Sequence, residues 1–314
     1  MARPAILVTY KLPSAAISRL EAIGEVEIYR EGAMAPDELL KRLPGKQAVV
    51  SLITDRMDKE AIDAGRELKV IANVAVGYNN IDVPHARSRG IIVTNTPEVL
   101  TDATADLTIG LILDITRRLT EGDRLVRAGG WKGWKLDFML GSELKGRQLG
   151  IVGIGRIGQA VAARARVFGM KIAFVARGGR AVAGAEGMSQ DRLLSTSDVV
   201  SLHLPLTDET RHLIDRTALA RMRRSAYLIN TSRGPVVDEE ALVWALREGI
   251  IAGAGLDVYE DEPKVHPGLL TLENVVLAPH LGSGTVETRT AMAELAARNA
   301  AAVLGGQPPI TPVP

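Results

Sequence analysis

The sequence has no cysteine among its 314 residues, which excludes disulfide bonds, thiolate metal ligands and cysteine nucleophiles. It also has almost no net charge, with 38 Lys and Arg against 37 Asp and Glu, so no positive field favours a nucleic-acid or acidic-membrane partner. Long hydrophobic runs are missing as well. Residues 107–115 are interrupted by Asp114 and are too few to span a membrane, and the apolar run at residues 5–8 is too short for a secretion signal. We therefore expect a cytoplasmic protein without nucleic-acid or membrane partners.

What is present is typical of a folded globular protein, with 46% hydrophobic and 24% charged residues and a length that predicts about two domains. Short β-rich runs alternate with helical patterns, which indicates parallel sheets covered by helices. A long apolar helix over about residues 98–128 separates two such series, and a second helix is expected over 285–304. Strands are expected at residues 5–9, 26–29, 48–52, 70–74, 91–94, 149–153, 171–175, 199–202, 226–230, 251–256 and 275–277.

The segment 153–158 matches the pattern G-x-G-x-x-G, between an apolar strand and a helical run. In that context the pattern predicts a dinucleotide-binding loop. Gly153 allows a tight turn, Gly155 lets a pyrophosphate approach the backbone, and Gly158 lets the helix pack closely on the strand. The helix N-terminus, at Arg156 and Ile157, offers free N–H groups to the anion. The alternative is a tight turn that binds no ligand.

The strand that follows predicts which dinucleotide is bound. NAD-binding folds usually place an Asp or Glu about 20 residues after the glycines, where it bonds the ribose 2′-hydroxyl. Here residues 171–175 are followed by Ala176, Arg177, two glycines and Arg180, so the acid is missing. Guanidinium groups hold a 2′-phosphate well, and we therefore expect NADPH in preference to NADH, bound by Arg177 and Arg180. The alternative is that both arginines are solvated loop charges.

Three further segments place polar residues just after expected strands, where open α/β sheets bind ligands. They contain Arg233, Glu262 and His280. Reduction of a 2-keto acid uses these three residue types: a protonated histidine donates to the developing alkoxide, a carboxylate orients the histidine, and an arginine grips the substrate carboxylate. Each residue alone has a structural alternative, but their joint position at three strand ends favours catalysis. No metal is required.

With these motifs, the chain resembles the D-isomer-specific 2-hydroxyacid dehydrogenases along nearly its whole length. Within that family it is most similar to the NADPH-dependent glyoxylate/hydroxypyruvate reductases. The matching segments are 74–82, 95–97, 101–111, 153–158, 203–207, 230–234, 256–263 and 279–280. The resemblance implies that Arg233 binds the substrate, that Glu262 rather than Glu260 or Asp261 pairs with the histidine, and that His280 is the acid/base. It also implies that the backbone N–H groups of Val76 and Gly77 meet the substrate carboxylate, and that the nicotinamide side of the cofactor site is lined by Thr104, Pro205, Thr231 and Asp257. For these last four, the alternative is ordinary capping and loop structure.

The resemblance further implies an α/β protein of two doubly wound parallel-sheet domains. A Rossmann dinucleotide-binding domain, residues 99–285, would be inserted into a flavodoxin-like substrate domain made of residues 1–98 and 286–314. Such enzymes are usually homodimers, and the long helix with the loop at 131–134 is the expected contact, unless both pack within one subunit. The missing acid at position 176 and the short chain, without a regulatory domain, favour the small NADPH reductases.

The expected reaction is the reduction of glyoxylate to glycolate and of hydroxypyruvate to D-glycerate. Two alternatives stay open. One keeps the chemistry with another 2-keto acid, such as 2-ketogluconate, pyruvate or a phenylpyruvate. The other is a nucleotide-sensing corepressor of this fold, which would bind the dinucleotide without rapid turnover.

Overall fold

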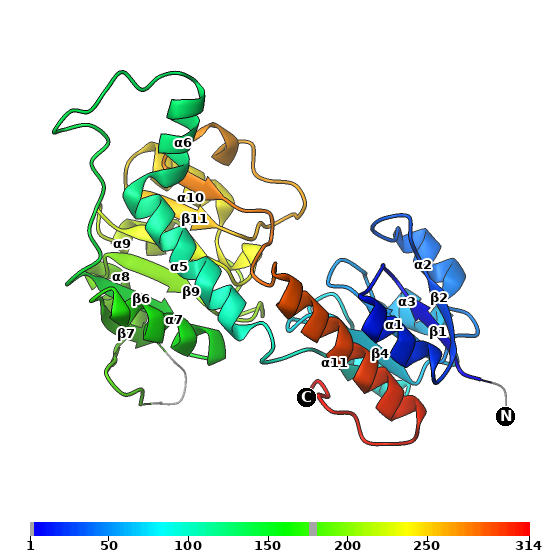
Figure 1. Cartoon of the computed structure of the whole chain (residues 1–314). Helices are drawn as coiled ribbons and strands as arrows, with labels where there is room; N and C mark the ends of the chain where they lie inside the picture. The colour runs from blue at the N-terminus through cyan, green and yellow to red at the C-terminus, as the bar shows by residue number, and fades with distance from the viewer. Residues whose placement is uncertain (1–2, 176–180) are drawn as a thin grey trace. The chain divides into compact units, whose positions relative to one another are not determined.

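The computed structural model describes residues 3–175 and 181–314, and the chain divides into two compact units (Figure 1). The first unit combines Met1–Leu100 with Thr285–Pro314, and the second is Thr101–Gly284. The second unit is therefore inserted, in sequence, between two parts of the first. In the part of the chain that is described, no helix is long and apolar enough to cross a bilayer.

The first unit is built on a five-stranded parallel sheet of order β2-β1-β3-β4-β5, the order found in flavodoxin-like folds. Its strands are β1 (Ala5–Val8), β2 (Glu25–Ile28), β3 (Ala48–Ser51), β4 (Val70–Asn73) and β5 (Ile92–Thr94). Its helices are α1 (Ser14–Glu21), α2 (Pro36–Arg42), α3 (Lys59–Ala64), α4 (Val83–Ser88) and α11 (Val286–Leu304).

Helices cover both faces of this sheet because side chains along each strand alternate between them. On β1, Ile6 and Val8 pack in the core beneath α1 and α11, whereas Leu7 packs in the core beneath α2, α3 and α4. The last helix lies beside the first, as the red and blue ribbons of Figure 1 show. The C-terminal segment thus completes the unit that the N-terminal segment begins.

The second unit holds a seven-stranded sheet of order β12-β11-β10-β9-β6-β7-β8, which is the Rossmann order with one extra strand at the end. Its strands are β6 (Gln148–Val152), β7 (Lys171–Val175), β8 (Glu186–Gly187), β9 (Val199–Leu202), β10 (Tyr227–Asn230), β11 (Gly253–Leu256) and β12 (Val275–Leu277). Its helices are α5 (Thr101–Arg117), α6 (Leu119–Arg127), α7 (Arg156–Val167), α8 (Gln190–Thr196), α9 (Arg216–Arg221) and α10 (Glu239–Arg247), with short 3₁₀ turns at Gly234–Val236 and Leu269–Thr271.

Two hydrophobic cores lie on opposite faces of this sheet. Leu149 and Ile151 of β6 pack with α5 and α7, whereas Val152 and the inward residues of β9 and β10 pack with α8, α9 and α10. The predicted fold class, two doubly wound parallel-sheet α/β domains including a Rossmann domain, is confirmed.

The single long helix expected over residues 98–128 is wrong. The structure has two helices, separated by Arg118 in the left-handed conformation with φ 58°. Two side-chain contacts stabilise the break: the Asp114 carboxylate accepts the Thr120 N–H at 2.8 Å, and the Arg118 guanidinium donates to both oxygens of Glu121 at 2.6 and 2.7 Å. The helical spacing of apolar residues continues across such a break, so this spacing alone does not predict where one helix ends and the next begins.

Candidate active site

The three polar segments predicted from the sequence follow three neighbouring strands of the second unit. Strands β10, β11 and β12 pair in parallel, so their carboxyl ends meet at one edge of the sheet. Arg233 follows β10, Glu262 follows β11 and His280 follows β12. The fold therefore brings residues from three distant stretches of sequence to the edge where open α/β sheets bind ligands.

His280 and Glu262 form a direct pair. The imidazole Nδ1 lies 2.7 Å from Oε2 of Glu262, and about a third of each side chain is exposed. The other carboxylate oxygen, Oε1, accepts the Tyr259 N–H at 3.0 Å. Because both of its carboxylate oxygens are engaged, Glu262 holds the imidazole ring in a defined orientation through Nδ1. The other ring nitrogen, Nε2, is left to meet a ligand.

The electrostatic surroundings keep Glu262 ionised. Burial alone would raise the pKa of this carboxyl, but the hydrogen bond and charge of His280, the Tyr259 N–H and the charge of Arg233 together hold the pKa below its usual value. An ionised Glu262 is therefore placed to accept a hydrogen bond from Nδ1 of His280.

Arg233 is held in a turn shaped by Asn230. The Asn230 amide donates to the Arg233 carbonyl at 2.9 Å, while its Oδ1 accepts the Ser232 N–H at 3.0 Å and the Ser232 hydroxyl at 2.8 Å. Burial lowers the pKa of the Arg233 guanidinium, and the nearby Glu262 charge opposes that effect. A partly buried guanidinium of this kind can bind a carboxylate through paired N–H bonds.

The loops carrying Arg233 and Glu262 touch directly at Gly234. A Cβ at Gly234 would overlap the Tyr259 carbonyl, so only glycine permits this approach. The Tyr259 hydroxyl donates to the Ala278 carbonyl at 2.9 Å, which joins the same loop to the segment before His280. Asn230 and Tyr259 were not predicted as supporting residues; their only signal in the sequence is their position within the matched segments.

Asp257 fixes the loop that contains His280. Its carboxylate accepts the N–H groups of Leu281 at 2.6 Å and Gly282 at 2.8 Å, and its main-chain carbonyl accepts the His280 N–H at 2.9 Å. Burial raises the pKa of this carboxyl, and the two N–H donors oppose the rise. In this structure Asp257 therefore acts through the loop backbone.

The threonines predicted for the nicotinamide side are also tied into the unit. The Thr104 hydroxyl donates to the Gly282 carbonyl at 3.1 Å, and the Thr231 and Thr108 hydroxyls lie 2.9 Å apart. Thr104 and Thr231 are both buried, and these bonds satisfy their hydroxyl groups there. Their role toward a cofactor stays a prediction.

The three glycines of the loop between β6 and α7 differ in their surroundings. Gly153 has φ +98°, and a Cβ there would lie 2.5 Å from the His203 carbonyl oxygen. A Cβ at Gly158 would overlap the Gly153 carbonyl, whereas a Cβ at Gly155 would meet nothing within 4 Å. Gly153 and Gly158 thus allow close packing of the backbone, and Gly155 leaves the loop backbone accessible from the side where a Cβ would lie.

A hollow of about 360 Å³ adjoins this loop. It is lined by Val152, Gly153, Ile154, Gly155, Val175, Gln190, Leu204, Pro205, Thr207, Glu209, Thr210 and Leu213. Helix α7 begins at Arg156 and includes Ile157, so the first N–H groups of the helix come directly after Gly155 in the chain. The exposed loop backbone, the helix start and the hollow fit a dinucleotide.

Four further residues were predicted for the site. Arg177 and Arg180 fall outside the described residues. Val76 and Gly77 lie in the first unit, in the loop after β4. Among residues 3–175 and 181–314, no group of three or more His, Asp or Glu side chains is placed to hold a metal ion.

The open position of Gly155 leads to a prediction. Gly155→Ala should leave the melting temperature nearly unchanged, because the backbone there is extended, with φ −72°, and the methyl group meets no protein atom. It should weaken dinucleotide binding by about tenfold, since the methyl would occupy the approach to the backbone N–H groups. Gly158→Ala is the matched control and should lower the melting temperature. Equal dinucleotide affinity in Gly155→Ala and the wild type, measured by calorimetry, would contradict this assignment.

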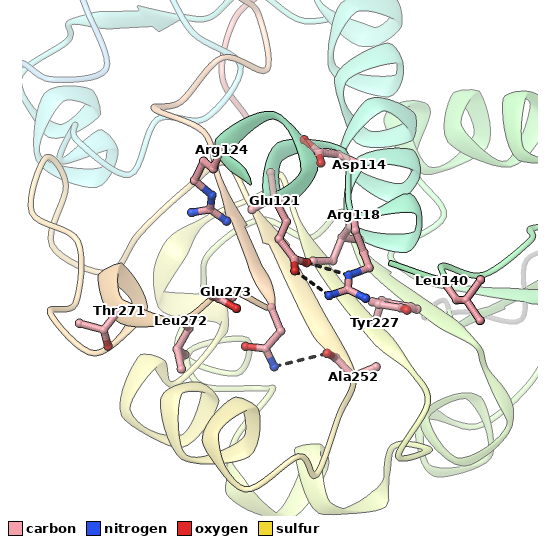
Figure 2. A pocket seen from close by; sticks show the side chains of 13 residues that line it. Asp114, Arg118, Glu121, Arg124, Leu140, Tyr227, Ala252, Thr271, Leu272 and Glu273 are labelled. Carbon is pink, nitrogen blue, oxygen red and sulfur yellow. Dashed lines mark hydrogen bonds and ion pairs between the residues drawn. The ribbon is translucent and has the colours of Figure 1, made fainter. Parts of the chain in front are cut away.

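A larger hollow, of about 530 Å³, lies elsewhere in the second unit, and its lining does not include Arg233, Glu262 or His280 (Figure 2). Its lining includes Tyr227, the first residue of β10, and Asn274, the residue before β12, so the hollow lies at the opposite edge of the sheet from Arg233. Figure 2 shows the Arg118–Glu121 ion pair on its wall. Size alone would place the site here, but the residues suited to hydride chemistry lie at the other edge.

Comparisons with known proteins identify relatives of this chain. The family model described as D-isomer specific 2-hydroxyacid dehydrogenase, NAD binding domain, matches residues 109–282. The glyoxylate reductase of Thermofilum pendens is 49% identical, over 98% of this chain and 94% of its own. A glyoxylate reductase structure from Paecilomyes thermophila is 36% identical with a TM-score of 0.91, covering 100% of this chain and 99% of that one.

A further structure is that of the NADPH-dependent glyoxylate/hydroxypyruvate reductase of Sinorhizobium meliloti in complex with NADP and malonate. It is 36% identical with a TM-score of 0.88, covering 99% of this chain and 97% of that one. The family resemblance inferred from the sequence is confirmed, and the second unit holds a nicotinamide-dinucleotide-binding domain. The chain therefore belongs to the D-isomer-specific 2-hydroxyacid dehydrogenase family.

Proposed function

We propose that this protein is an NADPH-dependent reductase of small 2-keto acids, which converts glyoxylate to glycolate and hydroxypyruvate to D-glycerate. The observation that carries the proposal is the His280–Glu262 pair at 2.7 Å, with the partly buried Arg233 after the neighbouring strand. The relatives named glyoxylate reductase support the choice of substrate.

In this proposal, each side chain has one task. Bound NADPH supplies a hydride to the keto carbon. Arg233 holds the substrate carboxylate with paired N–H bonds and polarises the adjacent carbonyl. His280 donates the proton on Nε2 to the carbonyl oxygen as charge develops there, so that the ketone gains one hydride and one proton and becomes an alcohol. Glu262 keeps the imidazole oriented through its contact with Nδ1.

The two units take different roles in this scheme. We assign residues 99–285 to the dinucleotide and residues 1–98 with 286–314 to the substrate. The glycine loop and its hollow in the second unit support the first assignment. The loop containing Val76 and Gly77 supports the second, because its backbone N–H groups can receive a carboxylate.

The preference for NADPH rests on Arg177 and Arg180, which follow β7 where NAD-binding folds have an acid. Arg177→Asp should raise the KM for NADPH by about tenfold or more, because a carboxylate repels the 2′-phosphate, and should change the KM for NADH far less. Steady-state kinetics with both cofactors provide the check. Equal changes for NADPH and NADH would refute the role of Arg177.

We also propose a homodimer. Large apolar side chains are exposed on and just after α6, a grouping that typically marks a contact surface. They are Leu119, Val126, Trp131, Trp134, Leu136, Phe138 and Leu140. Sedimentation should give twice the chain mass of 33.6 kDa; a monomer at micromolar concentration would rule this contact out.

The substrate is tested by a panel of keto acids. We expect kcat/KM to be highest for glyoxylate and hydroxypyruvate with NADPH. A higher kcat/KM for 2-ketogluconate, pyruvate or phenylpyruvate would keep the chemistry and change the substrate. Tight binding of the dinucleotide without turnover of any keto acid would favour a nucleotide sensor.

A further inference from the structure

The loop after β4 has three successive carbonyl groups that each accept a hydrogen bond. The Ala75 carbonyl accepts the Thr96 N–H at 2.9 Å. The Val76 carbonyl accepts the Asn95 side-chain amide at 2.8 Å, and the Gly77 carbonyl accepts the Asn73 side-chain amide at 2.9 Å. All three donors come from the ends of β4 and β5 or from the residues just after β5.

These bonds decide where the neighbouring N–H groups point. In a trans peptide the carbonyl and the N–H of one peptide group point in opposite directions. The N–H groups of Val76, Gly77 and Tyr78 are therefore directed away from Thr96, Asn95 and Asn73 respectively. In the described residues, none of these three N–H groups has an acceptor. Successive free N–H groups form a concave site for an anion.

The two asparagines are themselves held firmly. Asn73 is fully buried at the end of β4, with its Oδ1 3.5 Å from the Ser51 hydroxyl. Asn95 donates its backbone N–H to the Thr311 carbonyl at 3.2 Å and accepts the Thr311 hydroxyl at 2.6 Å. Residues 74–80 contain no charged side chain, so this loop can offer an anion only uncharged donors, among them its backbone N–H groups.

We propose that Asn73 and Asn95 are positioning residues that orient the N–H groups of Val76, Gly77 and Tyr78 toward the carboxylate of the keto acid. Tyr78 thereby supplies a third donor, beyond the two that the resemblance implied. The identity of the anion rests on the proposed function. Loss of either asparagine frees one carbonyl to rotate, and the N–H of the same peptide group turns with it.

The test compares Asn95→Ala and Asn73→Ala with a matched control, Asn274→Ala. Asn274 also donates its side-chain amide to two main-chain carbonyls, those of Leu246 at 3.2 Å and Ala252 at 3.3 Å, but it lies in the second unit. For each variant we measure KM and kcat for glyoxylate, the affinity of the NADP complex for malonate by calorimetry, and the melting temperature. Asn95 is only partly buried, so Asn95→Ala keeps the test valid if Asn73→Ala fails to fold.

For Asn95→Ala and for folded Asn73→Ala, the KM for glyoxylate and the Kd for malonate should rise by about tenfold, the size of one charge-assisted hydrogen bond. The kcat should change by less than about threefold, because the proton donor is untouched. Unchanged KM and Kd in a folded Asn95→Ala, or an equal rise in Asn274→Ala, would overturn the proposal. If the wild type does not reduce glyoxylate, the proposed function fails, and the malonate affinities still decide the role of the asparagines.

Discussion

Replacing His280 by glutamine should lower kcat for glyoxylate by about 10²- to 10⁴-fold, the range contributed by a well-placed general acid. Glutamine can keep a hydrogen bond to Glu262, which lies 2.7 Å from the imidazole, but it has no proton to give to the developing alkoxide. The affinity for NADPH should be nearly unchanged, because the glycine loop and its hollow do not include this residue. Stopped-flow and steady-state measurements of NADPH oxidation determine both quantities.

His266→Gln is the matched control for this variant. His266 also pairs with a glutamate, with Nε2 3.0 Å from Oε2 of Glu240, but that carboxylate is largely exposed and lies outside the candidate site. Its kcat should stay within about twofold of the wild type, as expected for an exposed ion pair. A His280→Gln enzyme as active as His266→Gln would remove the proton donor from the account.

Replacing Arg233 by glutamine should lower kcat/KM for glyoxylate by about 10²- to 10³-fold, as expected when the substrate carboxylate loses its charged partner. The loss has two physical sources. The substrate carboxylate loses its paired N–H donors, and Glu262 loses a positive neighbour that helps to hold its pKa below the usual value. Arg233→Lys should recover only part of the loss, because an ammonium group cannot reproduce the planar pair of bonds.

The control for Arg233 is Arg221→Gln. Arg221 lies on the surface and pairs with Asp191 at 2.8 Å, so its loss should leave kcat/KM unchanged. Full recovery of kcat/KM in Arg233→Lys would show that charge alone matters. An Arg233→Gln enzyme with unaltered kcat/KM would show that the substrate carboxylate is bound elsewhere.

Much of the fold could be predicted because its signals are local. The expected strands at 171–175, 199–202 and 275–277 agree with β7, β9 and β12. Buried parallel strands appear in a sequence as short apolar runs, and the glycine pattern marks the turn from β6 to α7. The break at Arg118 could not be predicted in this way, because it depends on side-chain bonds rather than on a change in hydrophobic pattern.

The candidate site could be predicted only in its most reactive members. Arg233, Glu262 and His280 stand out because their side chains suit the chemistry and because each follows an apolar run. Tyr259 and Asn230 act through contacts with main-chain groups, and such contacts depend on loop geometry that no short pattern contains. The same holds for Asn73 and Asn95, whose donation to successive carbonyls is visible only in the folded chain.

The most direct measurement of the central claim is glyoxylate-dependent oxidation of NADPH by the purified wild-type protein, with glycolate quantified at the end of the reaction. We expect one glycolate to form for each NADPH consumed, at a rate well above that without enzyme. Tight dinucleotide binding with no keto-acid reduction above background would contradict it, because Arg233, Glu262 and His280 would then form a site without the reaction assigned to them.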